Sequence, residues 1–408
     1  MPRPNTRSTA PAMPVFADHF RQAVQGLRGA LTELLASVPG LPKRPLPMAR
    51  ALGLNKNLVW KVDKIVRAAD PIDAAPHIPG EGGMRLVLAA FREHGAGQRE
   101  LDAVRAAVDE FDRMVSLHTG DRASLALMLG SLAAERPDPA RLSAGRKLAF
   151  QGNSSTLGVQ ARARFSLQMI APSAVKPGMV DVIAVGGLLG FRRLRTTAAW
   201  PLLRTQGFSD DEPNVRRAAL SGEPGIPLLR DFCSESLPEV RSIEREDGTL
   251  FELTEGPVGH TAESDWVFGW CTQALGSTHS DEEDGVAEFL LSLYTPAEAV
   301  VFDLLVHRDL PFEGAPALRT FSIMHGQPPF PVSRHGRYEI PLHQPLQELG
   351  RPPIVASQHI PRYREMVDFA CASQGWELDG FRGYRFELRY PPIPSTTVLT
   401  YPLLSPPG

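Results

Sequence analysis

The chain contains 408 residues, with 43 Lys and Arg against 46 Asp and Glu, and 43% of the residues are hydrophobic. This length is sufficient for two or three domains, and the composition is that of a globular protein rather than a disordered chain. No apolar run approaches the ~18–20 residues that a transmembrane helix needs, so we expect no membrane partner.

The cysteines and the N-terminus indicate a cytoplasmic protein. Cys233, Cys271 and Cys371 are odd in number and far apart, which makes a disulfide framework improbable. The first nine residues are polar and lack the apolar segment of a secretory signal. The eleven histidines show no metal-ligand spacing, and no nucleotide-binding motif is complete. We therefore expect no metal and no cofactor.

Charge is distributed unevenly along the chain. The first 67 residues contain eleven basic and three acidic side chains, which gives this segment a net charge of +8. The remaining residues carry a net charge of −11, so the overall value of −3 conceals a basic segment followed by an acidic one. A basic segment of this kind favours contact with a polyanion such as nucleic acid.

The N-terminal third is expected to be helical, after a loose tail at 1–14 that contains four prolines. A short helix is predicted at Pro47–Leu52, and Asn55 is a suitable N-cap for a helix that continues to about Ala69. A Pro/Gly-rich connector follows at 72–83. Apolar residues spaced by three and four predict the longer helices, at Val15–Val38, Met84–His94, Gln98–His118 and Arg122–Ala134.

Strands dominate the predictions for residues 140–408. Gly158–Ile170 alternates strictly between apolar and polar residues, which predicts a strand with one buried face. Asp247-Gly248 predicts the turn of a hairpin. Further elements are a helix and two strands, at Arg362–Ser373, Ala299–His307 and Phe381–Tyr390. The expected fold class is therefore α+β, with an all-helical N-terminal domain followed by a larger, strand-rich domain that contains both helices and strands.

Residues 45–67 have the pattern of two helices that cross at a steep angle through a tight turn. Such a pair needs a small residue at the crossing, a glycine at the turn and apolar residues on both facing sides. The required offsets are met by Met48, Ala49, Leu52, Gly53, Leu54, Val59 and Val62. This stretch of some 20 residues resembles the helix-turn-helix of bacterial DNA-binding transcriptional regulators, and the resemblance extends to no other part of the chain.

The resemblance implies that the second helix lies in the major groove of double-stranded DNA. Asparagine can bind adenine through both of its amide atoms, and lysine can donate to guanine or to phosphate. The residues expected to contact bases are Asn55, Lys56, Asn57, Trp60, Lys61 and Lys64. The residues expected to contact phosphates are Lys43, Arg44, Arg50 and Arg67. Residues 41–67 hold seven basic side chains and one acidic one, which adds to this expectation.

These observations together divide the chain into regions. Residues 1–14 form the tail, 15–71 the helix-turn-helix domain, 84–135 a helical connector or dimerisation region, and 140–408 an α+β domain for ligand sensing or protein interaction. Helix-turn-helix proteins usually bind DNA as dimers, so the expected partners are DNA, a second copy of the chain and a small-molecule or protein effector.

Alternatives remain open at this point. The hairpin could be an ordinary structural one with a solvated basic face, or it could bind a protein. The chain could instead be an enzyme with its active site in residues 140–408, lined by His307, Asp309 and His325. Val185–Gly190 is a weak candidate for a phosphate-binding turn before a helix, although its glycine spacing favours a simple packing turn. No catalytic residue is assigned.

Overall fold

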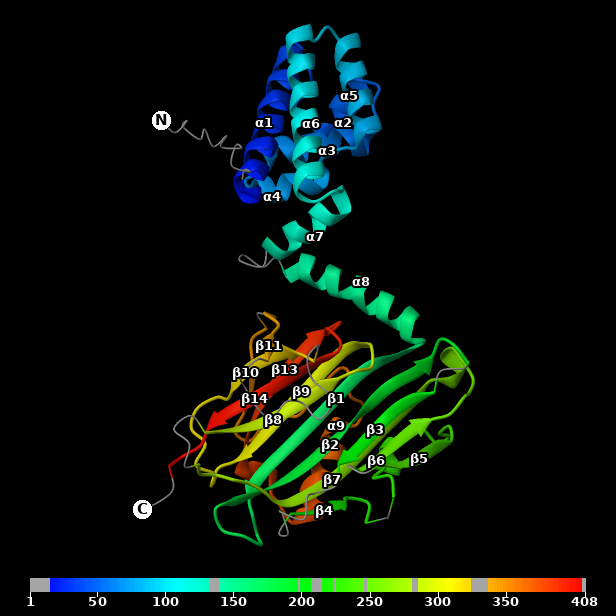
Figure 1. The fold of residues 1–408 in the computed structure, drawn as a ribbon, viewed down its shortest axis with the longest axis vertical. Helices are drawn as coiled ribbons and strands as arrows, with labels where there is room; N and C mark the ends of the chain where they lie inside the picture. The colour runs from blue at the N-terminus through cyan, green and yellow to red at the C-terminus, as the bar shows by residue number, and fades with distance from the viewer. Residues whose placement is uncertain are drawn as a thin grey trace, which may run out of the picture. The chain divides into compact units, whose positions relative to one another are not determined.

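The computed structural model describes residues 15–132, 139–196, 199–206, 215–222, 225–245, 248–280, 285–323, 337–342 and 344–405. The chain divides into two compact units, Met1–Asp138 (unit 1) and Pro139–Gly408 (unit 2) (Figure 1). Unit 1 is helical and unit 2 is rich in strands, which confirms the expected α+β fold class. The predicted tail at 1–14 lies outside the described residues. None of the described helices is long and apolar enough to cross a membrane.

The helices of unit 1 lie close to their predicted positions. Residues 72–83, predicted as a connector, contain two short helices, because Pro71 suits a first helical turn and the Asp70 side chain accepts a hydrogen bond from the Ile72 N–H at 2.8 Å. The elements are α1 (Phe16–Ser37), α2 (Pro45–Ala51), α3 (Lys56–Arg67), α4 (Pro71–Ala74), the 3₁₀ helix η1 (Ala75–His77), α5 (Glu81–Glu93), α6 (Gln98–His118) and α7 (Arg122–Leu132).

One hydrophobic core joins these helices, and it extends in sequence from Phe20 to Leu129. α1 and α6 pack together along their apolar faces, with Leu27 and Leu31 of α1 fully buried. The apolar face of α6 is likewise buried, including Val104. A dimer that formed through α6 would therefore have to use its polar faces.

Unit 2 contains three sheets among its described residues, together with helices α8 (Pro139–Leu157) and α9 (Tyr363–Gln374). The largest sheet has the order β12-β13-β9-β1-β2-β7-β4. Its strands are β1 (Val159–Pro172), β2 (Met179–Arg193), β4 (Arg216–Ala219), β7 (Ser264–Ser277), β9 (Ala297–His307), β12 (Gln347–Gly350) and β13 (Phe381–Arg389). Its strands pair antiparallel except β1 and β9, which are parallel.

The two smaller sheets have four and three strands. The four-stranded sheet is ordered β11-β10-β14-β8, from Tyr338–Glu339, Ala317–Ser322, Ser395–Pro402 and Val286–Leu293. The three-stranded sheet is ordered β3-β6-β5, from Trp200–Gln206, Gly248–Leu253 and Val240–Arg245. The last two strands form the hairpin that Asp247-Gly248 predicts, and β1 confirms a strand at Gly158–Ile170. The prediction that only one face of this strand is buried was wrong, because Ser166 and Ile170 on the other face are also buried.

The seven-stranded sheet is covered on both faces. On β9, Val301 and Leu305 pack in one core with residues of α9, whereas Phe302 and Leu304 pack in another core with residues of β8 and β14. Further along the face that carries Phe302, Trp266 of β7 packs with residues of the three-stranded sheet. The four-stranded and three-stranded sheets therefore share the face that α9 does not cover.

The glycines between Val185 and Gly190 form neither a phosphate-binding turn nor a turn before a helix. They lie inside β2, which continues through them and pairs with β1 and β7. A Cβ atom on Gly187 would overlap the backbone oxygen of Trp266 on β7, so only glycine permits this approach of the two backbones. Both predictions for this segment were therefore wrong.

Candidate nucleic-acid interface

The turn between α2 and α3 is built around Gly53. This glycine has a φ of +64°, the left-handed conformation that commonly ends a helix. The next backbone N–H, of Leu54, donates to the carbonyl of Ala49 at 2.9 Å and so returns the chain toward α2. Ala49 and Val59, which face each other's helices, are both buried. The small residue, the glycine and the apolar residues therefore lie where the spacing predicts them.

Asn55 caps the N-terminus of α3, as the sequence predicts. Its side-chain oxygen accepts a hydrogen bond from the backbone N–H of Asn57 at 2.8 Å. The cap uses one of the two polar atoms of the Asn55 amide. A base contact by Asn55 would therefore depend on its NH₂ group, while the Asn57 side chain is exposed at the first turn of the helix.

α3 is strongly amphipathic. Val59, Val62 and Ile65 form its buried face, and none of them is more than 3% exposed. Every residue expected to contact bases is exposed, namely Asn55, Lys56, Asn57, Trp60, Lys61 and Lys64. Five of them lie on α3 itself and Asn55 is its cap, so the fold brings together the side chains that the sequence pattern selects.

Trp60 has both a protein contact and an exposed surface. Its ring meets the ring of His77 in η1 edge to face, with the centroids 5.2 Å apart. The Lys64 ammonium lies 5.3 Å from the centre of the Trp60 ring, which is the geometry of a cation–π contact. Trp60 nevertheless remains 46% exposed, so the indole holds Lys64 at the surface of α3 rather than filling the core.

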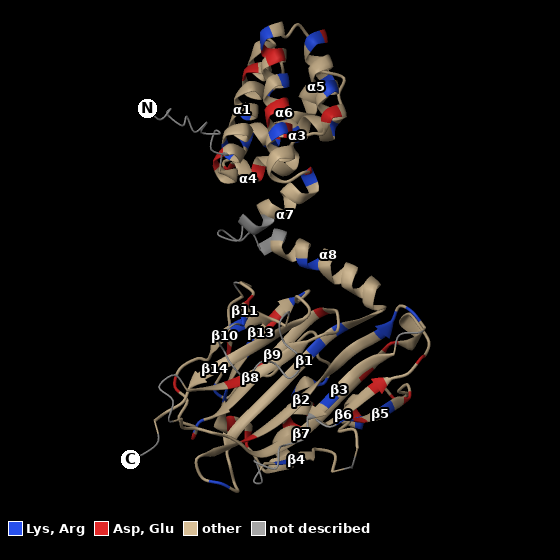
Figure 2. Cartoon of the chain, viewed as in Figure 1, with Lys and Arg blue, Asp and Glu red and all other residues tan. Residues whose placement is uncertain are grey.

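The residues expected to contact phosphates differ in how free their charges are. Lys43, Arg44 and Arg50 are exposed. Arg67 donates to the Asp63 carboxylate at 2.6 Å and to the carbonyl of Lys43 at 3.4 Å. Asp63 is the only acid in 41–67, and this ion pair offsets its charge within α3. Figure 2 marks the charged residues on the ribbon.

Of the three residues expected in the alternative active site, the structure describes His307 and Asp309. The Nδ1 atom of His307 accepts a hydrogen bond from the Asp309 backbone N–H at 3.3 Å, and its ring packs against Phe381. His307 and Asp309 thus form a local turn contact, and neither lines the pocket beside α9. His325 lies outside the described residues. Among the residues that the structure describes, no cluster of three His, Cys, Asp or Glu could hold a metal ion.

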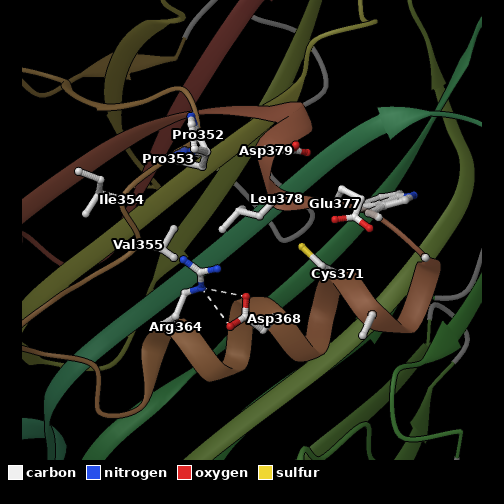
Figure 3. Close-up of a pocket in the computed structure, with 13 residues that line it drawn as sticks. Pro352, Pro353, Ile354, Val355, Arg364, Asp368, Cys371, Glu377, Leu378 and Asp379 are labelled. Atoms are coloured by element: carbon white, nitrogen blue, oxygen red, sulfur yellow. Dashed lines mark hydrogen bonds and ion pairs between the residues drawn. The ribbon is translucent and has the colours of Figure 1, made fainter.

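An open pocket of about 770 Å³ lies beside α9 (Figure 3). It is lined by residues 352–355, by one side of α9 from Arg364 to Ala372, and by residues 375–379. Cys371 reaches this pocket, but burial raises the pKa of its thiol to about 11. The thiol is therefore protonated at neutral pH and is a poor nucleophile. Arg364 and Asp368 pair with each other at 2.8 Å along the wall.

Sequence reasoning did not foresee this pocket. Its lining comes from two loops and one helix, and their separate patterns carry no signal that they meet. The only lining residue that the sequence analysis names is Cys371, as one of three cysteines too far apart for a disulfide framework, and its side chain is 5% exposed.

Comparisons with known proteins assign the chain to no family. No protein-family model matches the chain, and no curated protein matches it at a significant level. The functional argument therefore depends on the residues themselves.

Proposed function

We propose that this protein is a DNA-binding transcriptional regulator of the helix-turn-helix type, with α3 as the helix that enters the major groove of double-stranded DNA. The observation that carries the proposal is the division of α3 into a buried apolar face and an exposed face of asparagines, lysines and one tryptophan. A solvated structural helix needs no such concentration of basic residues on one side.

The proposed roles follow from position on α3. Lys56 and Asn57 lie in its first turn, which in this type of motif is nearest to the base edges. Lys61 and Lys64 lie one and two turns further along and divide between bases and phosphates. Trp60 rests against a sugar while it supports Lys64. The basic residues outside this face contact the backbone, namely Lys43, Arg44, Arg50 and Arg67.

The proposal also assigns a role to unit 2, a homodimeric state and a cytoplasmic location. Unit 2 senses a ligand or binds a protein, and a homodimer places two copies of α3 on two half-sites about one helical turn apart. The three cysteines are all free, which suits a reducing cytoplasm. The acidic charge of the remainder of the chain confines DNA contact to the basic segment.

Selection of genomic DNA fragments by the full-length chain tests this proposal. We expect wild-type protein to enrich a shared sequence, and we expect Asn57→Ala to lose discrimination at one position, because a bidentate base contact is worth about 1–3 kcal/mol. The control variant is Lys147→Ala/Lys176→Ala, which removes two exposed lysines from unit 2. No enrichment by the wild-type chain, or an identical enriched sequence for Asn57→Ala, would overturn the proposal.

A further inference from the structure

A second pocket lies on the face of the seven-stranded sheet that carries the two smaller sheets. Val180 and Val182 of β2 belong to the core beneath the four-stranded sheet. Trp270 of β7 packs at the border of the core beneath the three-stranded sheet. Between these two cores, the lining residues surround a pocket of about 390 Å³. This volume falls in the ordinary range for small-molecule sites, which is roughly 300–1,000 Å³.

The walls of this pocket are largely apolar. The aliphatic and aromatic side chains come from β2, β7, β8 and the segments after β9 and β14, namely Val180, Val182, Trp270, Phe289, Phe312 and Leu403. Leu275 and Leu290 also line it, and each is 38% exposed. A ligand with an apolar body would gain free energy by covering these two leucines.

Both charged side chains that line the pocket have partners within the protein. The Glu288 carboxylate accepts two hydrogen bonds from Arg337, at 2.8 and 3.1 Å. Arg217 donates from its Nε to the Thr272 hydroxyl at 3.2 Å, and its guanidinium carbon lies 5.9 Å from the centre of the Trp270 ring. A charged ligand would lose hydration in this pocket without gaining a counter-ion that is not already engaged, so the lining favours an uncharged ligand.

Gln168 of β1 contributes a polar group to the lining. Its side-chain NH₂ donates to the carbonyl of Leu290 in β8 at 2.9 Å, which holds the amide in place. None of the residues that the structure describes donates a hydrogen bond to the oxygen of this amide. An amide oxygen accepts hydrogen bonds from hydroxyl groups, so this atom can bind the hydroxyl of a ligand that enters the pocket.

We propose that this pocket binds a medium-chain aliphatic alcohol. The hydroxyl donates to the Gln168 amide oxygen, and the alkyl chain lies against Val180, Val182 and Phe289. Such a ligand covers the apolar walls and brings no charge into the pocket. The inference depends on no part of the DNA-binding proposal, because the lining residues all belong to unit 2 and occupancy can be measured without DNA.

Isothermal titration calorimetry of the full-length chain with 1-octanol tests the proposal. We expect one octanol molecule to bind per chain. Octanoate and octylamine have chains of similar length and opposite charges, and we expect each to bind at least about tenfold more weakly, because the charged group loses its hydration in the pocket. Failure of the wild type to bind octanol, or equal affinity for octanol and either ion, would overturn the proposal.

A second ligand tests the hydroxyl contact. 1-Methoxyheptane has the size of octanol but no hydroxyl to donate, so we expect it to bind the wild type about threefold more weakly. Gln168→Met removes the acceptor and should bind the two ligands equally. The matched control is Gln374→Met, which changes a glutamine of α9 outside the pocket and should keep the wild-type preference. A preference for octanol that survives in Gln168→Met would contradict the proposed contact.

Two substitutions in the walls test the location of the ligand. Ala184→Phe fills the pocket and should abolish octanol binding, with near-UV circular dichroism to establish that the variant is folded. Leu275→Asp changes a partly exposed wall residue and should weaken octanol binding about tenfold, because it removes apolar surface and adds a charge. Wild-type affinity in either folded variant would place octanol elsewhere and would contradict the proposal.

Discussion

The two units differ in how far apart in sequence their contacts lie. The helices of unit 1 follow one another into a single core, and the longer ones were recognisable from apolar residues three and four positions apart. The centre of unit 2 is a parallel pair, β1 and β9, in which Ala161 is opposite Ala297. Local periodicity therefore describes unit 1 well, whereas unit 2 depends on partners that lie more than a hundred residues away.

Charged residues also serve different purposes in the two units. In unit 1 the lysines of α3 are exposed, where they are available to a partner. In unit 2 the Asp303 carboxylate is fully buried and joins β9 to Arg385 of β13 and to Tyr363 of α9. The buried carboxylate of Asp303 thus holds distant segments of unit 2 together. Its removal should lower the unfolding free energy much more than removal of an exposed charge.

The largest effect is expected for Asp303→Ala. Arg385 donates to Asp303 at 2.8 and 2.7 Å, and the Tyr363 hydroxyl donates at 2.7 Å. The substitution leaves a buried guanidinium without its counter-ion, so unit 2 should lose about 3–5 kcal/mol of unfolding free energy. Urea unfolding followed by tryptophan fluorescence measures this in a Trp60→Phe background, because the other four tryptophans lie in unit 2.

Asp368→Ala is the control for this comparison. Asp368 pairs with Arg364 on the exposed side of α9, where both side chains are more than half exposed. The loss should be below about 1 kcal/mol. Equal losses for Asp303→Ala and Asp368→Ala would contradict the view that a buried charge pair holds unit 2 together.

Two glycine substitutions should have opposite effects on unit 1. Gly53→Ala places a side chain at a φ of +64° and should cost about 1 kcal/mol, although nothing lies within 4 Å of the new Cβ. Gly26→Ala lies within α1, where the new Cβ is also free of contacts, and should gain about 0.5–1 kcal/mol. Chemical unfolding followed by circular dichroism at 222 nm compares them. A change of the same sign in both would contradict the turn assigned to Gly53.

The two asparagines of α3 should separate stability from DNA binding. Asn55→Ala removes the cap and should destabilise unit 1 by about 1 kcal/mol. Asn57→Ala should change the unfolding free energy by less than about 0.5 kcal/mol, because its side chain is exposed. Chemical unfolding and DNA affinity are measured for both variants. A larger loss of unfolding free energy for Asn57→Ala than for Asn55→Ala would contradict the assignment of Asn55 as the cap.

The smallest effect concerns acid stability. A hydrogen bond from His19 of α1 lowers the pKa of Glu110 on α6 below its model-compound value of 4.5, with a further contribution from Arg113. Because the folded pKa is below the unfolded one, this contribution is present above pH 4.5 and is lost as the pH falls through the folded pKa. Unfolding titrations at several pH values should show that the unfolding free energy of Glu110→Gln falls less on acidification than that of the wild type. The neighbouring Asp109→Asn serves as the control.

The sequence predicts most of unit 1 for a physical reason. The longer helices have apolar faces of their own, and the α2–α3 pair has local signals as well, so Asn55 is recognisable as a cap and Gly53 as a turn before any tertiary contact is known. The candidate interface on α3 could be predicted for the same reason, since its buried and exposed faces are properties of one helix.

Unit 2 could be predicted only in part. The alternation of β1 and the Asp247-Gly248 hairpin are local signals, and both correctly predicted strands, although β1 is buried on both faces rather than one. The prediction of a turn at the glycines of β2 was wrong. Glycine is required at position 187 by the close approach of the β7 backbone, which lies about eighty residues further along the chain. The pocket beside α9 has no local signal, because its walls come from separate segments that meet only in the folded chain.

The salt dependence of DNA binding tests the central claim most directly. Fluorescence anisotropy with a selected fragment gives the slope of log K against log salt for the full-length chain, for Lys61→Ala/Lys64→Ala and for Lys147→Ala/Lys176→Ala. We predict that loss of the two α3 lysines weakens binding and reduces the magnitude of the slope, by about 1 for each of them that contacts a phosphate, while the unit 2 variant matches the wild type. An unchanged affinity and slope for Lys61→Ala/Lys64→Ala would contradict the assignment of α3 as the DNA-binding helix.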